Sequence, residues 1–183
     1  MTVLYIHGFG SSGLGSKATV FREYFENLGI KYIAPSLSYI PDLAILTLED
    51  IIKNCDNVKL IGSSLGGFYS IYLADKYNLK ATLINPAINP DITLTRAIPK
   101  ALNYYDLSYF DWSESYINML KKYKVAPKIE DRYMLMLQKG DETLDYEEAL
   151  NFLPKANTVL EDGGNHSFAN IEKHLDNIKE FLK

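Results

Sequence analysis

The chain has 183 residues, which is enough for one domain with a sizeable core. Its hydrophobic fraction of 47%, charged fraction of 23% and net charge of −4 are those of an ordinary globular protein, and they argue against a basic protein that binds nucleic acid or an anionic membrane. The single cysteine, Cys55, excludes an internal disulfide framework, and no apolar run reaches the roughly 20 residues of a membrane-spanning helix.

Along the chain, short β-rich runs alternate with longer helical runs, a pattern typical of parallel βα units. Met1 leads straight into the first run without a secretory signal, so we expect a cytoplasmic protein. The predicted strands are Val3–Ile6, Lys31–Ala34, Val58–Ile61, Ala81–Ile84, Tyr133–Leu137 and Thr158–Leu160. The predicted helices are Lys17–Leu28, Asp42–Asn54, Leu65–Tyr77, Tyr146–Phe152 and Phe168–Leu182. The sequence therefore predicts a single α/β domain over residues 1–183.

A glycine-rich loop, GFGSSGLGS at residues 8–16, follows the first strand. Its beginning fits the dinucleotide fingerprint G-x-G-x-x-G, but the second strand ends in IAPS without the acidic residue that would hold a ribose. A phosphate-binding P-loop fails too, because Ser16-Lys17 reverses the required order of lysine and hydroxyl residue. We therefore predict no nucleotide cofactor, and expect the loop to offer its backbone N–H groups to another anion.

The third strand runs into GSSLG, which fits G-x-S-x-G with Ser64 at its centre and precedes a predicted helix. A sharp strand-to-helix turn holds such a serine in a strained conformation, and side chains at the two glycine positions would collide with neighbouring backbone. Developing negative charge is favoured at the helix N-terminus, where Ser64 lies. The plainer interpretation is a Gly/Ser turn in which Ser64 only caps the helix.

From Ile88 to Lys128 the alternation of strands and helices stops, and the segment is rich in aromatic residues. It is too long for an ordinary connection, and we predict a small helical cap insertion without strands over one edge of the sheet. The aromatic side chains either dock this insertion on the body or line an apolar pocket. Tyr104, Tyr105 and Trp112 are the candidates for the pocket.

An acidic residue follows the fifth strand directly, at Asp141 in GDETLDY. The carboxyl ends of parallel strands share one rim, so Asp141 faces the same rim as Ser64. Asp145 is the alternative acid, although it also suits the N-cap of the next helix. Asp162 is a third possibility, within the loop that follows the last strand.

A serine hydroxyl needs a base to become a nucleophile, and the base needs an acid that orients it. The chain has three histidines. His166 lies in the loop EDGGNHSF after the last strand, where it can reach a neighbouring strand end. His7 lies in the first loop and His174 within the predicted C-terminal helix. We therefore predict a triad of Ser64, Asp141 and His166.

The chain resembles an α/β-hydrolase over nearly its whole length. LYIHGFGSS resembles the oxyanion loop of that fold, GSSLGG the nucleophile elbow, GDETLD the acid loop and GGNHSF the histidine loop. The small size and the motifs YIHGF.SS and LQ.GDE.LDY resemble those of the small bacterial YqiA/YcfP-like esterases. The resemblance implies a three-layer fold with a reduced, mainly parallel sheet of six strands in the order 2-1-3-4-5-6.

The resemblance also implies hydrolysis of a small-molecule carboxylic ester or acyl thioester without metal or cofactor. The backbone N–H groups of Phe9 and Leu65 would form the oxyanion hole, and His7 and Ser11 are further candidates to contact substrate. Amide or carbon–carbon bond cleavage on the same triad remains open, because all these reactions attack a carbonyl group. A non-catalytic binding module is the alternative from a different class.

Overall fold

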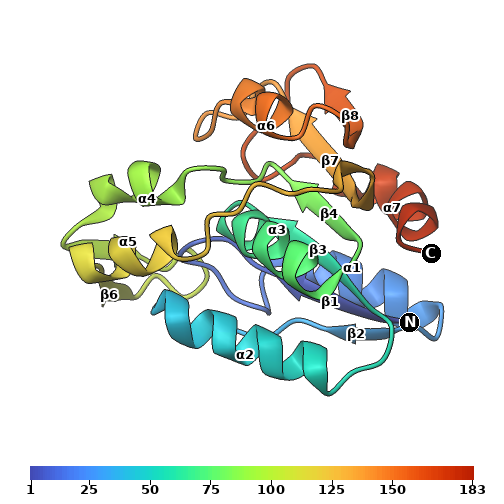
Figure 1. The fold of residues 1–183 in the computed structure, drawn as a ribbon, viewed down its shortest axis with the longest axis horizontal. Helices are drawn as coiled ribbons and strands as arrows, with labels where there is room; N and C mark the ends of the chain where they lie inside the picture. The colour runs from blue at the N-terminus through green and yellow to red at the C-terminus, as the bar shows by residue number, and fades with distance from the viewer.

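The centre of the molecule is a parallel sheet of six strands, seen in the computed structural model of residues 1–183 (Figure 1). The strands lie in the order β2-β1-β3-β4-β7-β8. Their bounds are β1 (Thr2–Ile6), β2 (Lys31–Ile33), β3 (Val58–Ser63), β4 (Ala81–Ile84), β7 (Tyr133–Gln138) and β8 (Asn157–Glu161). All five pairings are parallel, so the predicted class and strand order are confirmed.

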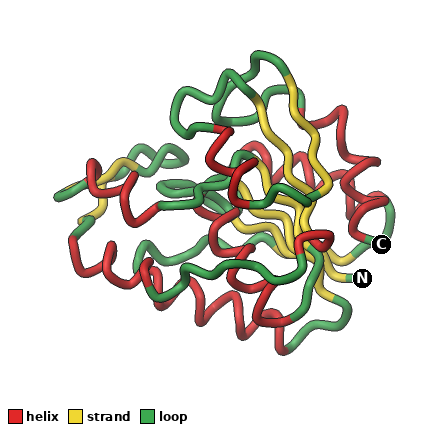
Figure 2. Tube along the Cα trace, turned by 45° about the horizontal axis from the view of Figure 1, so that its top comes forward, coloured by secondary structure: helices red, strands yellow, loops and turns green.

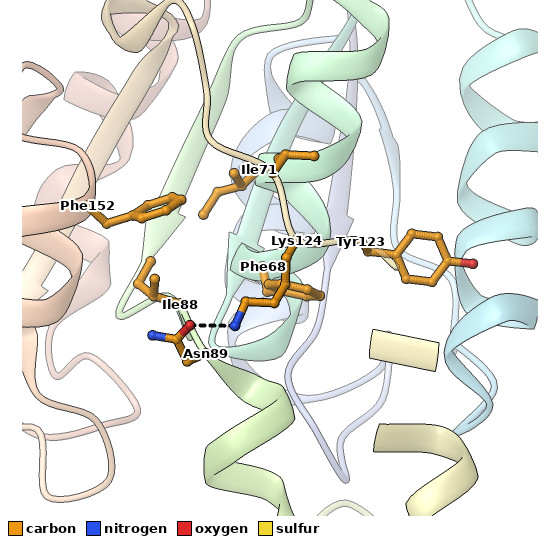
Figure 3. A pocket seen from close by; sticks show the side chains of 8 residues that line it. Phe68, Ile71, Ile88, Asn89, Tyr123, Lys124 and Phe152 are labelled. Carbon is orange, nitrogen blue, oxygen red and sulfur yellow. Dashed lines mark hydrogen bonds between the residues drawn. The ribbon is translucent and has the colours of Figure 1, made fainter. Parts of the chain in front are cut away.

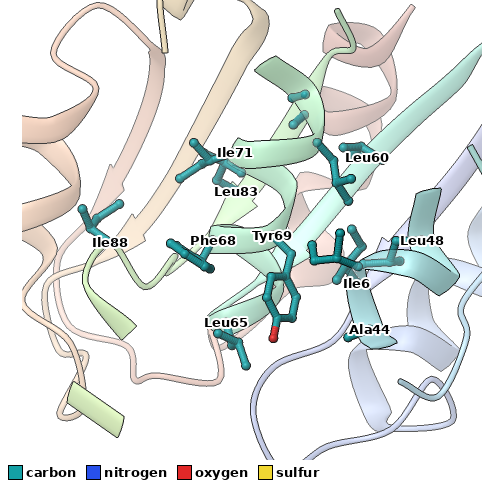
Figure 4. Close-up of a cluster of buried hydrophobic side chains, with 14 of the residues drawn as sticks. Ile6, Ala44, Leu48, Leu60, Leu65, Phe68, Tyr69, Ile71, Leu83 and Ile88 are labelled. Carbon is teal, nitrogen blue, oxygen red and sulfur yellow. The ribbon is translucent and has the colours of Figure 1, made fainter. Parts of the chain in front are cut away.

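Helices cover both faces of the sheet, as the nearly continuous apolar strands predict. The helices are α1 (Ser16–Asn27), α2 (Pro41–Lys53), α3 (Leu65–Tyr77), α6 (Tyr146–Phe152) and α7 (Leu175–Leu182). The side chains of β1 alternate between the two layers: Leu4 and Ile6 join the cluster under α2 and α3, and Val3 and Tyr5 join the cluster under α1 and α7. Figure 4 shows part of the first cluster. None of the helices is long and apolar enough to cross a membrane.

The C-terminal helix begins later than the sequence pattern predicts. Phe168 and Asn170 have φ angles of 59° and 60°, which an α-helix does not permit. A short 3₁₀ turn, Ile171–His174, follows, and α7 starts only at Leu175. The predicted helix Phe168–Leu182 is therefore wrong in its first half.

The segment of residues 88–128, called here the cap segment, has a small sheet of its own. It contains α4 (Pro90–Thr93), a 3₁₀ turn (Leu94–Ala97), β5 (Lys100–Leu102), β6 (Tyr109–Asp111) and α5 (Glu114–Lys121). The antiparallel pair of β5 and β6 lies apart from the main sheet (Figure 2). The prediction of an insertion without strands is therefore wrong. Each of the two strands has only three residues and buries only one of them, Ala101 in β5 and Phe110 in β6. Such short strands leave no alternating pattern to detect.

Candidate active site

Ser64 lies at the turn between β3 and α3 with φ 55° and ψ −120°, a conformation that non-glycine residues rarely adopt. The glycines two residues to either side make this turn possible. A Cβ atom at Gly62 would lie 2.3 Å from the carbonyl oxygen of Gly66, and one at Gly66 would lie 2.0 Å from that of Ile6. The elbow therefore packs against β1, and the G-x-S-x-G spacing is a steric requirement of that packing.

Three side chains from three loops meet at the carboxyl ends of the strands. The Nε2 atom of His166 lies 3.0 Å from the hydroxyl oxygen of Ser64, and its Nδ1 atom lies 2.8 Å from Oδ2 of Asp141. The geometry fits an imidazole that donates its Nδ1 proton to the carboxylate and accepts the serine proton at Nε2. The structure thus brings together the three residues that the sequence predicts as a triad.

The carboxylate of Asp141 is held in place from the other side by backbone. Its Oδ1 accepts hydrogen bonds from the N–H groups of Thr143 and Leu144 at 2.8 and 2.9 Å, and its side chain is only 2% exposed. Burial raises the pKa of Asp141, but the hydrogen bonds from His166 and from these two N–H groups outweigh it and leave the pKa below its usual value. Asp141 is therefore a carboxylate at neutral pH.

Neither alternative acid reaches His166. Asp145 is the N-cap of α6, where its side chain accepts a hydrogen bond from the N–H of Glu147 at 2.9 Å. Asp162 is exposed and pairs with Lys139 at 2.6 Å. Both carboxylates therefore have partners away from the imidazole.

The loop after β1 places backbone N–H groups beside the nucleophile. A Cβ atom at Gly8 would lie 3.7 Å from the Ser64 hydroxyl oxygen, so the backbone of this loop approaches the serine closely. The N–H groups of Phe9 and Leu65 make no hydrogen bond to any group of the protein. Two unpaired donors next to a half-buried serine are what a developing oxyanion needs.

His7 fastens this loop to the loop that precedes α2. Its Nδ1 donates to the carbonyl oxygen of Gly8 at 2.8 Å, and its Nε2 accepts from the N–H of Leu37 at 3.0 Å. Burial lowers the pKa of His7, which fits the neutral ring that these two bonds require. With both nitrogens occupied, His7 has no free polar atom to offer a substrate. Ser11 lies half-buried further along the same loop.

Two buried amides, which the sequence reasoning missed, hold the loop that carries His166. The side chain of Asn85, just after β4, donates to the carbonyl oxygens of Asn165 and His166 at 3.0 and 3.2 Å. Gln138, the last residue of β7, accepts from the N–H groups of Asn165 and Ala169 at 3.1 and 2.8 Å. A polar residue at the carboxyl end of a buried strand was the only signal available for either one.

Charged side chains also hold the His166 loop. Glu142 accepts the backbone N–H of His166 at 3.0 Å. The ammonium group of Lys17, in the first turn of α1, donates to the carbonyl oxygen of Ser167 at 2.7 Å. Burial lowers the pKa of Lys17 to about 8, against the opposing effect of the Asp141 carboxylate.

The chain has no group of three or more His, Cys, Asp or Glu side chains arranged to hold a metal ion.

The aromatic residues of the cap segment occupy different environments from one another. Trp112 is 1% exposed, packs edge-on against the ring of Phe9 at 4.7 Å, and donates its indole N–H to the carbonyl oxygen of Leu94. It therefore belongs to the core and not to a pocket wall. Tyr104 is 72% exposed and lies beside Gly10, whose carbonyl accepts its backbone N–H at 2.7 Å, and Tyr105 is half exposed.

Two hollows border α3. The first, of about 20 Å³, borders the loop after β1, and its lining includes Leu65 and Tyr69 of α3. The second, of about 90 Å³, lies beneath the cap segment and is mostly apolar, with Phe68, Ile88 and Phe152 in its wall (Figure 3). At its edge the ammonium group of Lys124 is 2.8 Å from the side-chain oxygen of Asn89. No predicted pocket residue lines this second hollow.

Comparison with known proteins places the chain among relatives of the same length. The model of a family described as "Uncharacterised protein family (UPF0227)" matches residues 2–183. A UPF0227 protein of Vibrio parahaemolyticus is 24% identical over 185 residues, which cover 98% of each chain. Mouse alpha/beta hydrolase domain-containing protein 10 superposes with a TM-score of 0.78 at 16% identity, covering 99% of this chain and 89% of its own. An esterase of Pyrococcus furiosus superposes with a TM-score of 0.70 at 18% identity, covering 99% and 80%.

Proposed function

This chain belongs to the UPF0227 family and has the α/β-hydrolase fold, and we propose that it is a serine esterase that hydrolyses carboxylic esters or acyl thioesters. The observation that carries the proposal is the continuous line of hydrogen bonds from Ser64 through His166 to Asp141, at 3.0 and 2.8 Å. The structural likeness to an esterase supports it at the level of the fold.

The mechanism follows from the position of each group. His166 takes the hydroxyl proton of Ser64 at Nε2 while the serine oxygen attacks the carbonyl carbon, and Asp141 stabilises the imidazolium. The N–H groups of Phe9 and Leu65 bind the oxyanion. His166 then gives the proton to the leaving alcohol or thiol. A water molecule hydrolyses the acyl-enzyme by the same steps, which returns the proton to Ser64.

The test is covalent labelling with a fluorophosphonate, which reacts only with an activated serine. We expect the wild-type protein to be labelled and Ser64→Ala to lose both the labelling and the hydrolysis of nitrophenyl esters. Ser63→Ala is the matched control. Ser63 is the last residue of β3, precedes Ser64 directly and is buried, so this substitution should leave the labelling intact. A folded wild-type protein that is not labelled would contradict the proposal and favour a non-catalytic binding module.

A further inference from the structure

Tyr69 of α3 is almost wholly buried, but its hydroxyl oxygen keeps contact with solvent and makes no hydrogen bond to the protein. The residue is only 3% exposed, and its ring packs beside Phe68 within the cluster under α2 and α3. The buried hydroxyl of Tyr133, by contrast, donates to the carbonyl oxygen of Ile71. Because the Tyr69 hydroxyl has no partner within the chain and borders an open hollow, it is free to pair with a group that enters from outside.

The hydroxyl lies at the end of α3 that begins with the nucleophile. Helical side chains lean towards the N-terminus of their helix, and a tyrosine spans about one turn, so the Tyr69 hydroxyl reaches the level of Leu65. Figure 4 shows the ring extending past the aliphatic side chains with its oxygen beside Leu65. Tyr69 and Leu65 line the same small hollow, together with Gly8 and Phe9 of the proposed oxyanion loop.

The position of this hollow determines which half of an ester can enter it. The leaving group must lie near Nε2 of His166, from which it receives its proton. The rest of the wall consists of His7, Gly10 and residues 37–39 before α2, and no residue of the loop that carries His166 lines the hollow. The acyl group of the substrate is therefore the half that enters the hollow.

The lining also limits the chemistry of that acyl group. A volume of about 20 Å³ admits one or two heavy atoms. No Lys, Arg, Asp or Glu side chain lines the hollow, and both nitrogens of His7 are already bonded. Burial raises the pKa of Tyr69, so the hydroxyl keeps its proton and can donate. The hollow suits a small neutral oxygen and offers nothing to a carboxylate or phosphate.

We propose that the hydroxyl of Tyr69 binds an oxygen on the acyl group of the substrate, close to the carbonyl that Ser64 attacks. Esters of short hydroxyacyl or ketoacyl groups are then preferred over plain alkyl esters of the same length. This inference rests on the proposed esterase function and names its substrate class. A site built to pair with a substrate oxygen discriminates strongly against the analogue that lacks it.

The experiment compares nitrophenyl esters of 3-hydroxybutyrate and butyrate. We expect wild-type kcat/KM to favour the hydroxylated ester by about tenfold, and Tyr69→Phe, which removes one oxygen atom, to reduce that preference to about twofold or less. The rate on butyrate should stay within about twofold. Tyr72→Phe is the matched control, because Tyr72 lies on the same helix outside the hollow, and it should keep the wild-type preference.

The outcomes separate this inference from the proposed function. A wild-type protein that is labelled by the fluorophosphonate but prefers butyrate would overturn the inference and leave the esterase proposal standing. Equal losses on both esters in Tyr69→Phe would also overturn it, because they would indicate a packing role. The wild-type preference alone decides the matter if Tyr69→Phe does not fold. Absence of labelling in the wild type would instead contradict the esterase proposal, and the inference with it.

Discussion

The loop that carries His166, at the rim of the sheet, and the cap segment are attached to the rest of the molecule by different kinds of interaction. At the rim, the loop that carries His166 is fastened by hydrogen bonds from buried amides, such as those of Asn85 and Gln138. The cap segment is attached largely by apolar contact, with the ring of Phe9 packed against Phe110 and Trp112. Directional bonds fix positions, whereas packing mainly supplies stability. Substitutions at the rim should therefore change turnover, and substitutions in the cap segment should change the free energy of unfolding.

The largest effect is expected at Asp141. Asp141→Asn keeps the volume but removes the charge that orients His166, and we expect kcat to fall by about 10³–10⁴-fold with little loss of stability. Asp145→Asn is the control, because asparagine is as good an N-cap as aspartate and should leave kcat within about twofold. Steady-state kinetics on a nitrophenyl ester measure both. A larger loss in Asp145→Asn than in Asp141→Asn would reverse the assignment of the acid.

The complementary test lies in the cap segment. Trp112→Ala removes a fully buried ring and an indole hydrogen bond, and we expect it to lower the free energy of unfolding by about 3–5 kcal/mol. Tyr104→Ala, at an exposed position of the same segment, should change it by no more than about 0.5 kcal/mol. Urea unfolding measures both values. If Trp112→Ala lost turnover as severely as Asp141→Asn while remaining stable, the division between the two regions would be wrong.

The contrast between the rim of the sheet and the cap segment also explains which parts of the structure the sequence could predict. Ser64, Asp141 and His166 each follow an apolar run, and the carboxyl ends of parallel strands meet at one rim, so their proximity was predictable and the structure shows it. Their catalytic roles remain a prediction. The strand order was also predictable, because consecutive βα units allow few topologies.

What the sequence could not reveal depends on tertiary contacts. Gln138 ends an apolar strand and looks like an ordinary turn residue until its amide is seen to bind the backbone of Asn165 and Ala169. The same anchored loop puts Phe168 and Asn170 at positive φ, which delays the start of α7. In the cap segment, Trp112 and Tyr104 belong to one aromatic run, and only the packed structure separates the buried ring from the exposed one.

The last prediction concerns Lys17, which forms the charged contact between α1 and the His166 loop. Its pKa is about 8 in the folded protein, lowered by burial from 10.5. Between these two pH values the unfolded chain holds the proton and the folded chain does not, so this residue makes the free energy of unfolding rise with pH across that window. In Lys17→Met the rise disappears. The difference in unfolding free energy between wild type and Lys17→Met should therefore move in favour of the wild type from pH 8 to pH 10. A difference that stayed constant over this range would show that the Lys17 ammonium is not desolvated, and that the contact with Ser167 is an ordinary surface hydrogen bond.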